Sequence, residues 1–539
     1  MTTAAPARPS SDVSALDTLR SVAARLALPA ILLIPILLYL PFLQEPFEGD
    51  EGAYGTIAQQ MMHGALPYRD LFDHKPPLVY VWYAASFLLF GENIIAPRIA
   101  AALVWSATTF LVFLQAKMIL TRRQAYIASF LFAMSCSLTM LSFNANTEVF
   151  LLLPLLGSTI AFTKAKQTGN WRWLLLCGAC GGLAALTKQV AVWNMVALAL
   201  IAAVPLIREK NWRRLVIEQA ALGVSALVVL LVVLIPWIAS GALSDFYYAT
   251  VTYNGMYSNR LTLSERVLFT WYGMQAFMMV SAPYVGLTLL ALPFAIRRRS
   301  WADVLIVGSL AGAMFGVATS GLYFRHYFVV ALPFMALVAA PFLENTFTKP
   351  GTKMPFVLTM TLLIALGLFF NLPAFLGSTP EERHLAKFLN AQGTRENAVH
   401  HVADFMRNNT APNEPIYDYG RATQVYFYAD RPPAIAFMYD RPFWLDEQTL
   451  TKGLKELWAN PPRYVTDSVV FKDDEEWHKY HPPEVLDWFR ANYDFIERIE
   501  FADVYQRKAV PDAPGEVSKP FLPKGFEYRN PSASQFSVQ

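Results

Sequence analysis

Two adjacent carboxylates, Asp50 and Glu51, stand just after the first membrane-length apolar run of the chain, residues 27–43. Further along the same polar stretch, Asp73, His74 and Lys75 precede two prolines. A carboxylate in this position can take a proton from an acceptor hydroxyl, and its neighbour can orient it or bind a metal. The lysine can hold an anion. These residues predict group transfer to an alcohol at a membrane surface.

A structural interpretation of the same residues stays open. Asp50 and Glu51 precede Tyr54 and an apolar pattern typical of an amphipathic helix lying on the membrane, so they could serve only as its acidic N-terminal turn. Lys75 could simply extend its ammonium from the apolar layer to the interface. The residue pattern alone does not decide between these roles and a catalytic one.

The composition of the chain places it in a membrane. Of its 539 residues 55% are hydrophobic and 16% are charged, and the mean hydropathy is +0.32. Charge-free runs long enough to cross a bilayer recur from about residue 27 to 380, after which charged residues return at the density of a soluble domain. The net charge of +3 does not indicate a nucleic-acid partner.

Basic clusters between the apolar runs set the expected orientation of the spans, because such clusters prefer the cytoplasmic side. The clusters are Arg20/Arg25, Arg122/Arg123, Lys164/Lys166/Arg172, Arg208/Lys210/Arg213/Arg214, Arg297/Arg298/Arg299 and Lys349/Lys353. We expect about eleven spans, with the N-terminus inside and the C-terminus outside: 27–44, 97–117, 124–143, 148–164, 173–187, 189–207, 215–239, 273–296, 303–322, 327–343 and 354–376.

The fold class expected from these patterns is mainly α: a polytopic transmembrane helical bundle with a soluble C-terminal α/β domain. A cytoplasmic segment, 1–26, precedes a bundle of residues 27–376, whose first outward loop is 45–95. Within that loop, residues 76–91 predict a juxtamembrane helix, since a span there would invert every later segment. The outward domain, 377–539, contains a predicted helix at 397–409 and strands at 415–419, 434–438 and 464–471.

Other ionisable residues fall on the same predicted side. Glu148 begins a span, where it could act in catalysis or only complement the helix dipole. Arg325 and His326 occupy a short outward turn, and an arginine there requires an anionic partner such as a phosphate. Lys188 is a further outward cation, unless it merely snorkels. Together these groups match the cleavage of a lipid-linked phosphate ester.

Short motifs in a fixed order across residues 27–345 give a resemblance to a family. The chain resembles bacterial GT-C integral-membrane glycosyltransferases of the protein mannosyltransferase type, which include the lipid A aminoarabinose transferase and RgtA/B/C/D-like enzymes. The motifs are Gly49-Asp50-Glu51-Gly-Ala-Tyr54, His74-Lys75-Pro76-Pro77, Phe90-Gly91-Glu92 with Arg98, Asn146-Thr147-Glu148, Gly182–Lys188 and Phe324-Arg325-His326-Tyr327.

The resemblance implies a GT-C fold and an inverting transfer of sugar from a polyprenyl phosphate, outside the bacterial cytoplasmic membrane, to a lipid, glycan or protein acceptor. It implies that Asp50 is the general base, that Glu51 orients it or shares its work, and that Glu148 is a second catalytic acid. Lys75 and Arg325 are expected to meet the donor phosphate. Tyr54, His74, Lys188 and His326 complete the expected substrate-binding set.

One departure from the family pattern concerns a metal. Relatives have Glu-Lys-Pro-Pro where this chain has His74-Lys75-Pro76-Pro77. His74 could replace the glutamate as a ligand, together with Glu148, or no metal is used, so a divalent cofactor is left open. Two other functions also stay open, a lipid-linked glycan ligase or polymerase and a lipid or glycan transporter without transferase chemistry. Acids concentrated in the first loop, at one face, favour the transferase.

Overall fold

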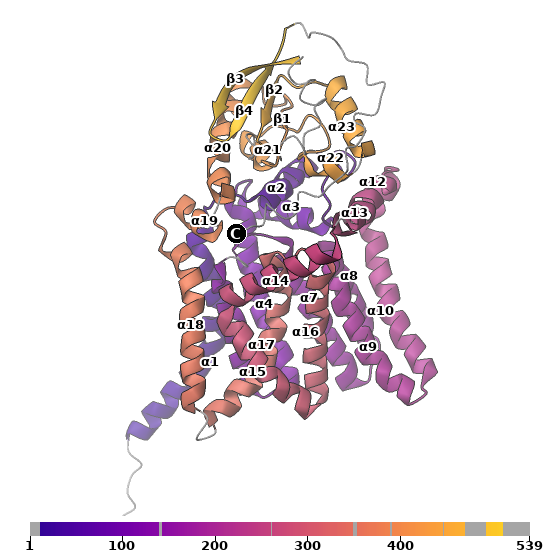
Figure 1. Cartoon of the computed structure of the whole chain (residues 1–539). Helices are drawn as coiled ribbons and strands as arrows, with labels where there is room; N and C mark the ends of the chain where they lie inside the picture. Colours follow the sequence, from indigo (N-terminus) through magenta and orange to yellow (C-terminus); the bar gives the residue numbers. More distant parts are fainter. Residues whose placement is uncertain are drawn as a thin grey trace, which may run out of the picture.

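A computed structural model describes residues 11–139, 143–259, 261–348, 353–388, 391–445, 447–468 and 492–509. The molecule is a long helical bundle with a smaller domain seated on one end of it (Figure 1). The two predicted parts of the chain, an apolar bundle and a C-terminal α/β domain, are therefore both present. Their junction is where the candidate site lies.

Eight helical segments in the described part of the chain are long and apolar enough to cross a membrane. Only helices can satisfy their backbone groups in hydrocarbon without a partner segment, which explains this architecture. They are built on α1 (Ser11–Tyr39), α4 (Ile95–Ile119), α7 (Thr147–Thr168), α9 (Val192–Arg208), α10 (Trp212–Val233), α16 (Trp301–Thr319), α17 (Leu332–Thr348) and α18 (Lys353–Leu376).

The other three predicted spans also form helices, but none is one long straight helix. Residues 124–143 and 173–187 correspond to the shorter helices α5 (Arg122–Met134) and α8 (Trp173–Thr187). The predicted span 273–296 is broken into α14 (Leu263–Val280) and α15 (Ala282–Arg298), which meet at 101°. Pro283 follows the break, and a proline there cannot continue the hydrogen-bond ladder of α14. The bent pair would raise the number of spans among the described residues to nine.

Two short helices cap the bundle beneath the C-terminal domain, α2 (Gly49–Met62) and α3 (Leu78–Phe90) (Figure 1). The helix expected over 76–91 is thus found as α3. The expectation that α2 lies on the membrane with one exposed face is wrong, because every residue from Glu51 to Gln59 is buried. The C-terminal domain covers α2 so closely that a side chain at Gly52 would meet the backbone of Gln424 at 2.7 Å.

The segment that follows α10 turns back along the same end of the bundle. It consists of α11 (Ile235–Ala239), α12 (Leu243–Tyr247), a π-helical turn (Tyr248–Thr252) and α13 (Tyr253–Asn259). Figure 1 shows α12 and α13 near the C-terminal domain, above α14. This segment therefore forms one side of the junction.

In its described residues the C-terminal domain combines five helices with one mixed sheet. In the sheet, of order β1-β2-β4-β3, β1 pairs parallel with β2, and β4 pairs antiparallel with both β2 and β3. The elements are α19 (Pro380–Phe388), α20 (Ala391–Asn409), β1 (Tyr417–Asp418), α21 (Gln424–Ala429), α22 (Arg441–Leu445), α23 (Glu447–Ala459), β2 (Tyr464–Asp467), β3 (Tyr493–Ile499) and β4 (Ala502–Arg507).

Most of the elements expected in this domain form where predicted. The helix at 397–409 and the strands near 415–419 and 464–471 appear as α20, β1 and β2, although residues 469–471 lie outside the described part. The expected strand at 434–438 is wrong, because this segment makes no ladder with the sheet. Ala434 N donates to the carbonyl of Ile416 beside β1, and Phe437 then makes an isolated bridge to Phe72 of the first loop. The contact with the first loop could not be predicted from the tail alone.

Candidate active site

A cavity of about 360 Å³ lies between the bundle and the C-terminal domain. Its walls come from the start of α2, the 73–75 loop, the turn before α7, α13, the turn before α17 and several segments of the C-terminal domain. The lining residues are Glu48, Gly49, Asp50, Ala53, Asp73, His74, Lys75, Thr139, Asn144, Asn146, Tyr257, Phe324, Arg325, His326, Tyr327, Lys387, Phe388, Arg395, Glu396, Arg421, Thr423, Tyr439 and Arg441.

Asp50 and Lys75 form an ion pair at this cavity. Lys75 Nζ lies 3.4 Å from Asp50 Oδ2, and the Asp50 side chain is 41% exposed whereas that of Lys75 is 9% exposed. Asp50 occupies the first turn of α2, where the helix dipole favours a carboxylate. The acid expected to act as base thus faces the cavity, and the cation stands against it.

Asp73 and His74 hold Lys75 in place. His74 Nε2 is 3.3 Å from Lys75 Nζ, and His74 Nδ1 is 3.2 Å from an Asp73 oxygen and 3.3 Å from the hydroxyl of Tyr439. Tyr80 donates a hydrogen bond of 2.9 Å to the other oxygen of Asp73. A neutral imidazole with its proton on Nδ1 satisfies this arrangement, since Nε2 can then accept from the ammonium.

The electrostatics of the loop favour an ionised Asp50. Burial within the walls of the cavity alone would raise its pKa, but Lys75, with His326 and His74, holds the pKa of Asp50 well below its ordinary value. Burial and the nearby Lys75 charge lower the pKa of His74 in spite of Asp73. At neutral pH the pair is therefore Asp50⁻ with Lys75⁺, beside an uncharged imidazole.

Glu51 lies outside the cavity, whereas a residue that shared proton transfer with Asp50 would be expected to line it. It is fully buried, and its carboxylate binds Arg98 Nη2 at 2.7 Å and Nε at 3.2 Å. The same carboxylate accepts from the backbone N–H of Ala145 at 2.8 Å and from that of Glu48 at 3.2 Å. Glu51 does not line the cavity; it fixes the N-terminus of α2, and so Asp50, onto the bundle.

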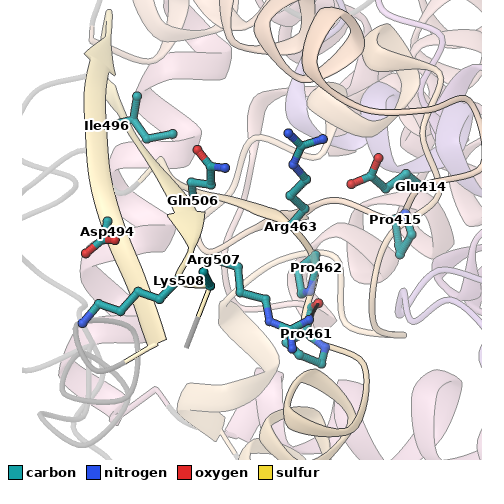
Figure 2. A pocket seen from close by; sticks show the side chains of 11 residues that line it. Glu414, Pro415, Pro461, Pro462, Arg463, Asp494, Ile496, Gln506, Arg507 and Lys508 are labelled. Carbon is teal, nitrogen blue, oxygen red and sulfur yellow. Dashed lines mark hydrogen bonds between the residues drawn. The ribbon is translucent and has the colours of Figure 1, made fainter. Parts of the chain in front are cut away.

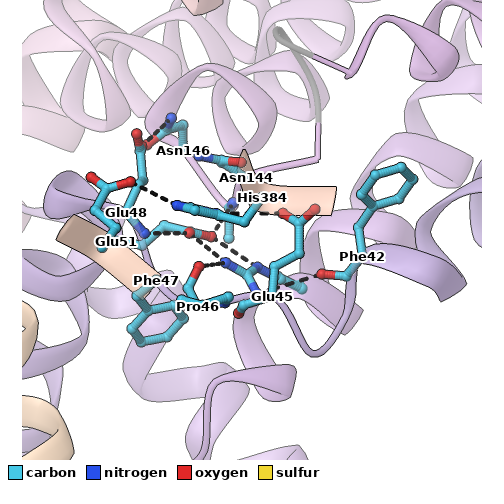
Figure 3. A network of polar contacts seen from close by, with 12 residues as sticks. Phe42, Glu45, Pro46, Phe47, Glu48, Glu51, Asn144, Asn146 and His384 are labelled. Carbon is cyan, nitrogen blue, oxygen red and sulfur yellow. Dashed lines mark hydrogen bonds and ion pairs between the residues drawn. The ribbon is translucent and has the colours of Figure 1, made fainter. Parts of the chain in front are cut away.

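Figure 3 shows the polar network around this N-terminus, including Glu45, Glu48, Glu51 and His384. On its other side, Lys387 Nζ of α19 binds Glu45 at 2.7 Å, and His384 Nε2 lies 2.8 Å from Glu396 of α20. Glu396 also accepts a 3.1 Å hydrogen bond from the backbone of Gly49. The bundle and the C-terminal domain therefore fix the position of Asp50 jointly.

Glu148 and Lys188, both expected at the site, stand behind it. They form a buried ion pair with each other, and Thr147 donates to the second oxygen of Glu148 at 2.8 Å. His326 Nε2 lies 3.7 Å from Glu148, and Lys188 Nζ stacks 3.8 Å from the centre of the Tyr327 ring. The side chain of Glu148 is 1% exposed. This pair thus supports the turn that carries Arg325 and His326.

The structure divides the predicted set into two groups. Asp50, His74, Lys75, Arg325 and His326 are brought together at the cavity. Glu51, Tyr54, Glu148 and Lys188 do not line it; Tyr54 is 1% exposed and presents its ring 5.8 Å from Lys75 Nζ. The last four are better described as residues that position the first five.

Sequence analysis missed two groups of residues at the site. Arg98, quoted only as part of a motif, is fully buried and binds both Glu51 and the carbonyl of Pro46, the latter at 2.8 Å. An arginine inside an apolar run was the signal that could have identified it. The second group comes from the C-terminal domain, and no motif marks it: Lys387, Arg395, Glu396, Arg421, Tyr439 and Arg441.

The residues proposed as metal ligands do not fit that role. His74 directs one ring nitrogen at an ammonium and the other at Asp73 and Tyr439, while Glu148 is paired with Lys188. In the part of the chain that the structure describes, no three His, Cys, Asp or Glu side chains gather as a metal-binding group. No step below is derived through a metal.

A second pocket, of about 740 Å³, lies on the C-terminal domain itself (Figure 2). It is formed beside β3 and β4 by residues such as Arg463, Asp494, Gln506 and Lys508. This pocket is larger than the junction cavity, but it opens broadly to the surface. Its described lining contains no histidine and no residue of the helical bundle. We therefore place the candidate active site at the junction.

Comparisons with known proteins give one family match and relatives in sequence and in fold. Residues 74–239 match the family model described as dolichyl-phosphate-mannose-protein mannosyltransferase. Over 198 residues the chain is 27% identical to an undecaprenyl phosphate-alpha-4-amino-4-deoxy-L-arabinose arabinosyl transferase of Pseudomonas savastanoi pv. phaseolicola. That match covers 35% of this chain and 36% of the relative, so it spans about a third of the relative's length.

Two solved structures share the fold over most of the chain. ArnT from Cupriavidus metallidurans bound to undecaprenyl phosphate matches with a TM-score of 0.63 at 16% identity, covering 89% of this chain and 98% of that one. The apo form of the same protein matches with a TM-score of 0.60 at 16% identity, covering 92% and 98%. The chain is thus a multi-pass membrane protein with a fold like that of ArnT, and its similarity to the mannosyltransferase family model over residues 74–239 agrees with the resemblance drawn from the motifs.

Proposed function

We propose that this protein transfers a sugar from a polyprenyl-phosphate donor to the hydroxyl of an acceptor, with inversion at the anomeric carbon. The observation that carries the proposal is the Asp50–Lys75 pair, 3.4 Å apart at the wall of the junction cavity. A base and an anion-binding cation on one wall suit a reaction that removes a proton and releases a phosphate. The solved relative of similar fold holds undecaprenyl phosphate, which supports a donor of that class.

In the proposed reaction, Asp50 takes the proton of the acceptor hydroxyl while that oxygen bonds to the anomeric carbon. The bond between this carbon and the phosphate oxygen breaks, and its electron pair leaves with the polyprenyl phosphate. Lys75 and Arg325 stabilise the charge that develops on the departing phosphate. His74 stays neutral and orients Lys75 through the 3.3 Å contact between them.

Donor binding would also strengthen the base. In the free protein the Lys75 charge holds the pKa of Asp50 low, which makes Asp50 a weak proton acceptor. The phosphodiester monoanion of the donor beside Lys75 offsets that charge, so the pKa of Asp50 rises when donor is present. The transfer is thereby restricted to the complex that already contains donor.

The test compares radiolabelled undecaprenyl-phosphate sugars as donors for purified wild type and for Asp50→Asn. We expect Asp50→Asn to lower the transfer rate about 10²–10⁴-fold, because it removes the general base, while undecaprenyl phosphate binding changes less than about twofold. Asp70→Asn is a matched control: Asp70 lies in the same loop, is 35% exposed and pairs with Arg69. Transfer by Asp50→Asn at the wild-type rate would refute the assignment.

We also propose that the junction faces the outside of a bacterial cytoplasmic membrane. Basic clusters lie in or just before the first turns of α10 and α18 in the sequence, and these helices begin remote from the C-terminal domain and end close to it (Figure 1). Such clusters prefer the cytoplasmic side. A reporter enzyme fused after Thr379 should be active only outside the cytoplasm, and activity inside would contradict this orientation.

A further inference from the structure

Three arginines of the C-terminal domain line the same cavity as the Asp50–Lys75 pair. Arg395 belongs to α20, Arg421 lies in the turn before α21, and Arg441 is the first residue of α22. None of them belongs to the transmembrane motifs. They converge on one wall only because the domain folds over the end of the bundle.

These arginines are held close to Asp50 by contacts with the residue that precedes it. The neighbour of Arg395, Glu396, accepts a hydrogen bond from Gly49 N at 3.1 Å. A side-chain carbon placed on Gly49 would lie 4.0 Å from the carbonyl oxygen of Arg421. Two residues on from Arg421, Thr423 donates a 2.6 Å hydrogen bond to the Gly49 carbonyl. Arg395 and Arg421 are thus anchored at the start of α2.

The third arginine connects to the wall that holds the donor residues. Arg441 Nη1 donates to the hydroxyl of Tyr257 at 3.0 Å, and the ring of Tyr257 lies 5.5 Å from the ring of His74. The arginine wall therefore continues into the Asp73–Lys75 loop. A ligand that reached the arginines would share the cavity with Asp50 and Lys75.

A buried carboxylate, Asp440, interacts with the arginines of this wall. It is 1% exposed and lies 3.4 Å from Arg421 Nε. Burial raises the pKa of Asp440, and the charges of Arg421, Arg441 and Arg395 oppose this effect. Burial lowers the pKa of Arg421, whereas the negative charge of Asp440 raises it. Repulsion from Arg441 and Arg395 lowers it further, and the pKa falls to about 10. Like charges held this close in an enclosed space favour an anionic ligand.

The cavity as a whole has the same imbalance. Its described lining contains six lysines and arginines against four carboxylates. One of these carboxylates, Glu48, has a pKa raised well above its ordinary value by burial and by the nearby Asp50 and Glu51, which favours its neutral form. Lys387 and Arg421 have carboxylate partners outside this lining, Glu45 and Asp440, so the excess of cationic side chains applies to the groups that face the cavity.

We propose that Arg395, Arg421 and Arg441 form a second anion-binding subsite, which takes a phosphate or carboxylate group carried by the acceptor. This inference rests on the proposed function, and it adds the chemical class of the acceptor. Guanidinium groups present paired N–H donors that match the oxygens of a phosphate or carboxylate. An acceptor held in this way would place a neighbouring hydroxyl at Asp50, while the donor phosphate occupies Lys75 and Arg325.

The test titrates methyl phosphate into the purified full-length protein by calorimetry, in the presence of saturating undecaprenyl phosphate. We expect the wild type to bind both ligands, and Arg395→Gln and Arg441→Gln each to weaken methyl phosphate at least tenfold. Undecaprenyl phosphate affinity should change less than twofold in these variants. Lys75→Gln should give the opposite pattern.

Two further variants keep the test interpretable. Arg407→Gln makes the same change on the same helix as Arg395, at an exposed pair with Asp404, and should bind methyl phosphate as the wild type does. Because Arg421→Gln would leave Asp440 buried without its partner, Arg421→Lys is used instead, with circular dichroism as the folding control. Its charge remains but its paired donors are lost, so we expect weakening of several-fold.

Three results would overturn the inference. Methyl phosphate could be displaced by undecaprenyl phosphate, the arginine variants could bind methyl phosphate like the wild type, or they could lose undecaprenyl phosphate to the same extent. The last result would assign the arginines to the donor. Failure of the proposed function has a different signature, which is a wild type that neither binds undecaprenyl phosphate nor transfers sugar, whatever the methyl phosphate titration shows.

Discussion

The two walls of the junction cavity differ in how their charges are balanced. On the bundle side each buried lysine has a carboxylate, Lys75 with Asp50 and Lys188 with Glu148. On the side of the C-terminal domain, Arg395, Arg421 and Arg441 surround Asp440. The lysines of the bundle side thus each have a carboxylate partner, whereas three arginines of the C-terminal domain act on the same carboxylate, Asp440. The comparison suggests that the first wall is built to position a reaction and the second to attract a ligand.

The largest expected effect comes from breaking a pair on the bundle wall. Glu148→Ala leaves Lys188 buried without its carboxylate, and we expect it to reduce the free energy of unfolding by about 3–5 kcal/mol. Thermal unfolding in detergent, followed by circular dichroism, measures the loss. The matched control is Glu344→Ala, which removes a 3.8 Å pair with Arg123, whose side chain is 66% exposed, and should cost at most about 1 kcal/mol. Equal effects would show that the buried pair has no special role.

The next effect concerns the pH dependence of transfer. Because Lys75 holds the pKa of Asp50 below its ordinary value, Asp50 stays ionised as pH falls until its lowered pKa is reached. Lys75→Met removes the positive charge that lowers the pKa of Asp50, whereas burial still raises that pKa. The pKa of Asp50 therefore rises, and the acid limb of kcat/KM moves to higher pH, by about one unit or more. Profiles of kcat/KM against pH for both proteins check this shift. An unmoved acid limb would mean that another group limits the rate.

The smallest effect is on the arginine wall. Arg395→Gln removes one of three mutually repelling charges, so we expect the free energy of unfolding to stay within about 0.5 kcal/mol of the wild type or to rise slightly. Thermal unfolding without phosphate in the buffer measures this, with Arg407→Gln as the control on α20. A loss of several kcal/mol would show that Arg395 is part of the framework, and the contrast between the two walls would disappear.

The local signals of the chain predicted much of the architecture. Apolar runs between basic clusters marked the segments that become helices, and the return of charge after residue 380 marked the second domain. The errors arose where packing overrides a local pattern. α2 has an acidic start and apolar spacing like a membrane-surface helix, yet the C-terminal domain buries it. The segment 434–438 alternates like a strand, yet it makes no ladder with the sheet and contacts the first loop of the bundle.

The same limit applies to the site. Asp50, His74, Lys75, Arg325 and His326 could be selected from the sequence, because ionisable residues at the ends of apolar helices are costly unless they have a role. Their division from Glu51, Tyr54, Glu148 and Lys188 could not, because both groups have the same residue types and the same flanking patterns. Asp50 faces the cavity because the first turn of α2 directs it there, while the neighbouring Glu51 points to the buried Arg98.

By itself the sequence determined the chemical inventory and its side of the bundle, since hydropathy and charge act locally along the chain. Only the tertiary structure decided the pairing: Glu51 with Arg98, Glu148 with Lys188 and Asp50 with Lys75. It also brought Arg395, Arg421 and Arg441 to Asp50 across more than 340 residues of chain. Coulomb energy depends on distance in space and on burial, and neither is fixed by separation along the sequence.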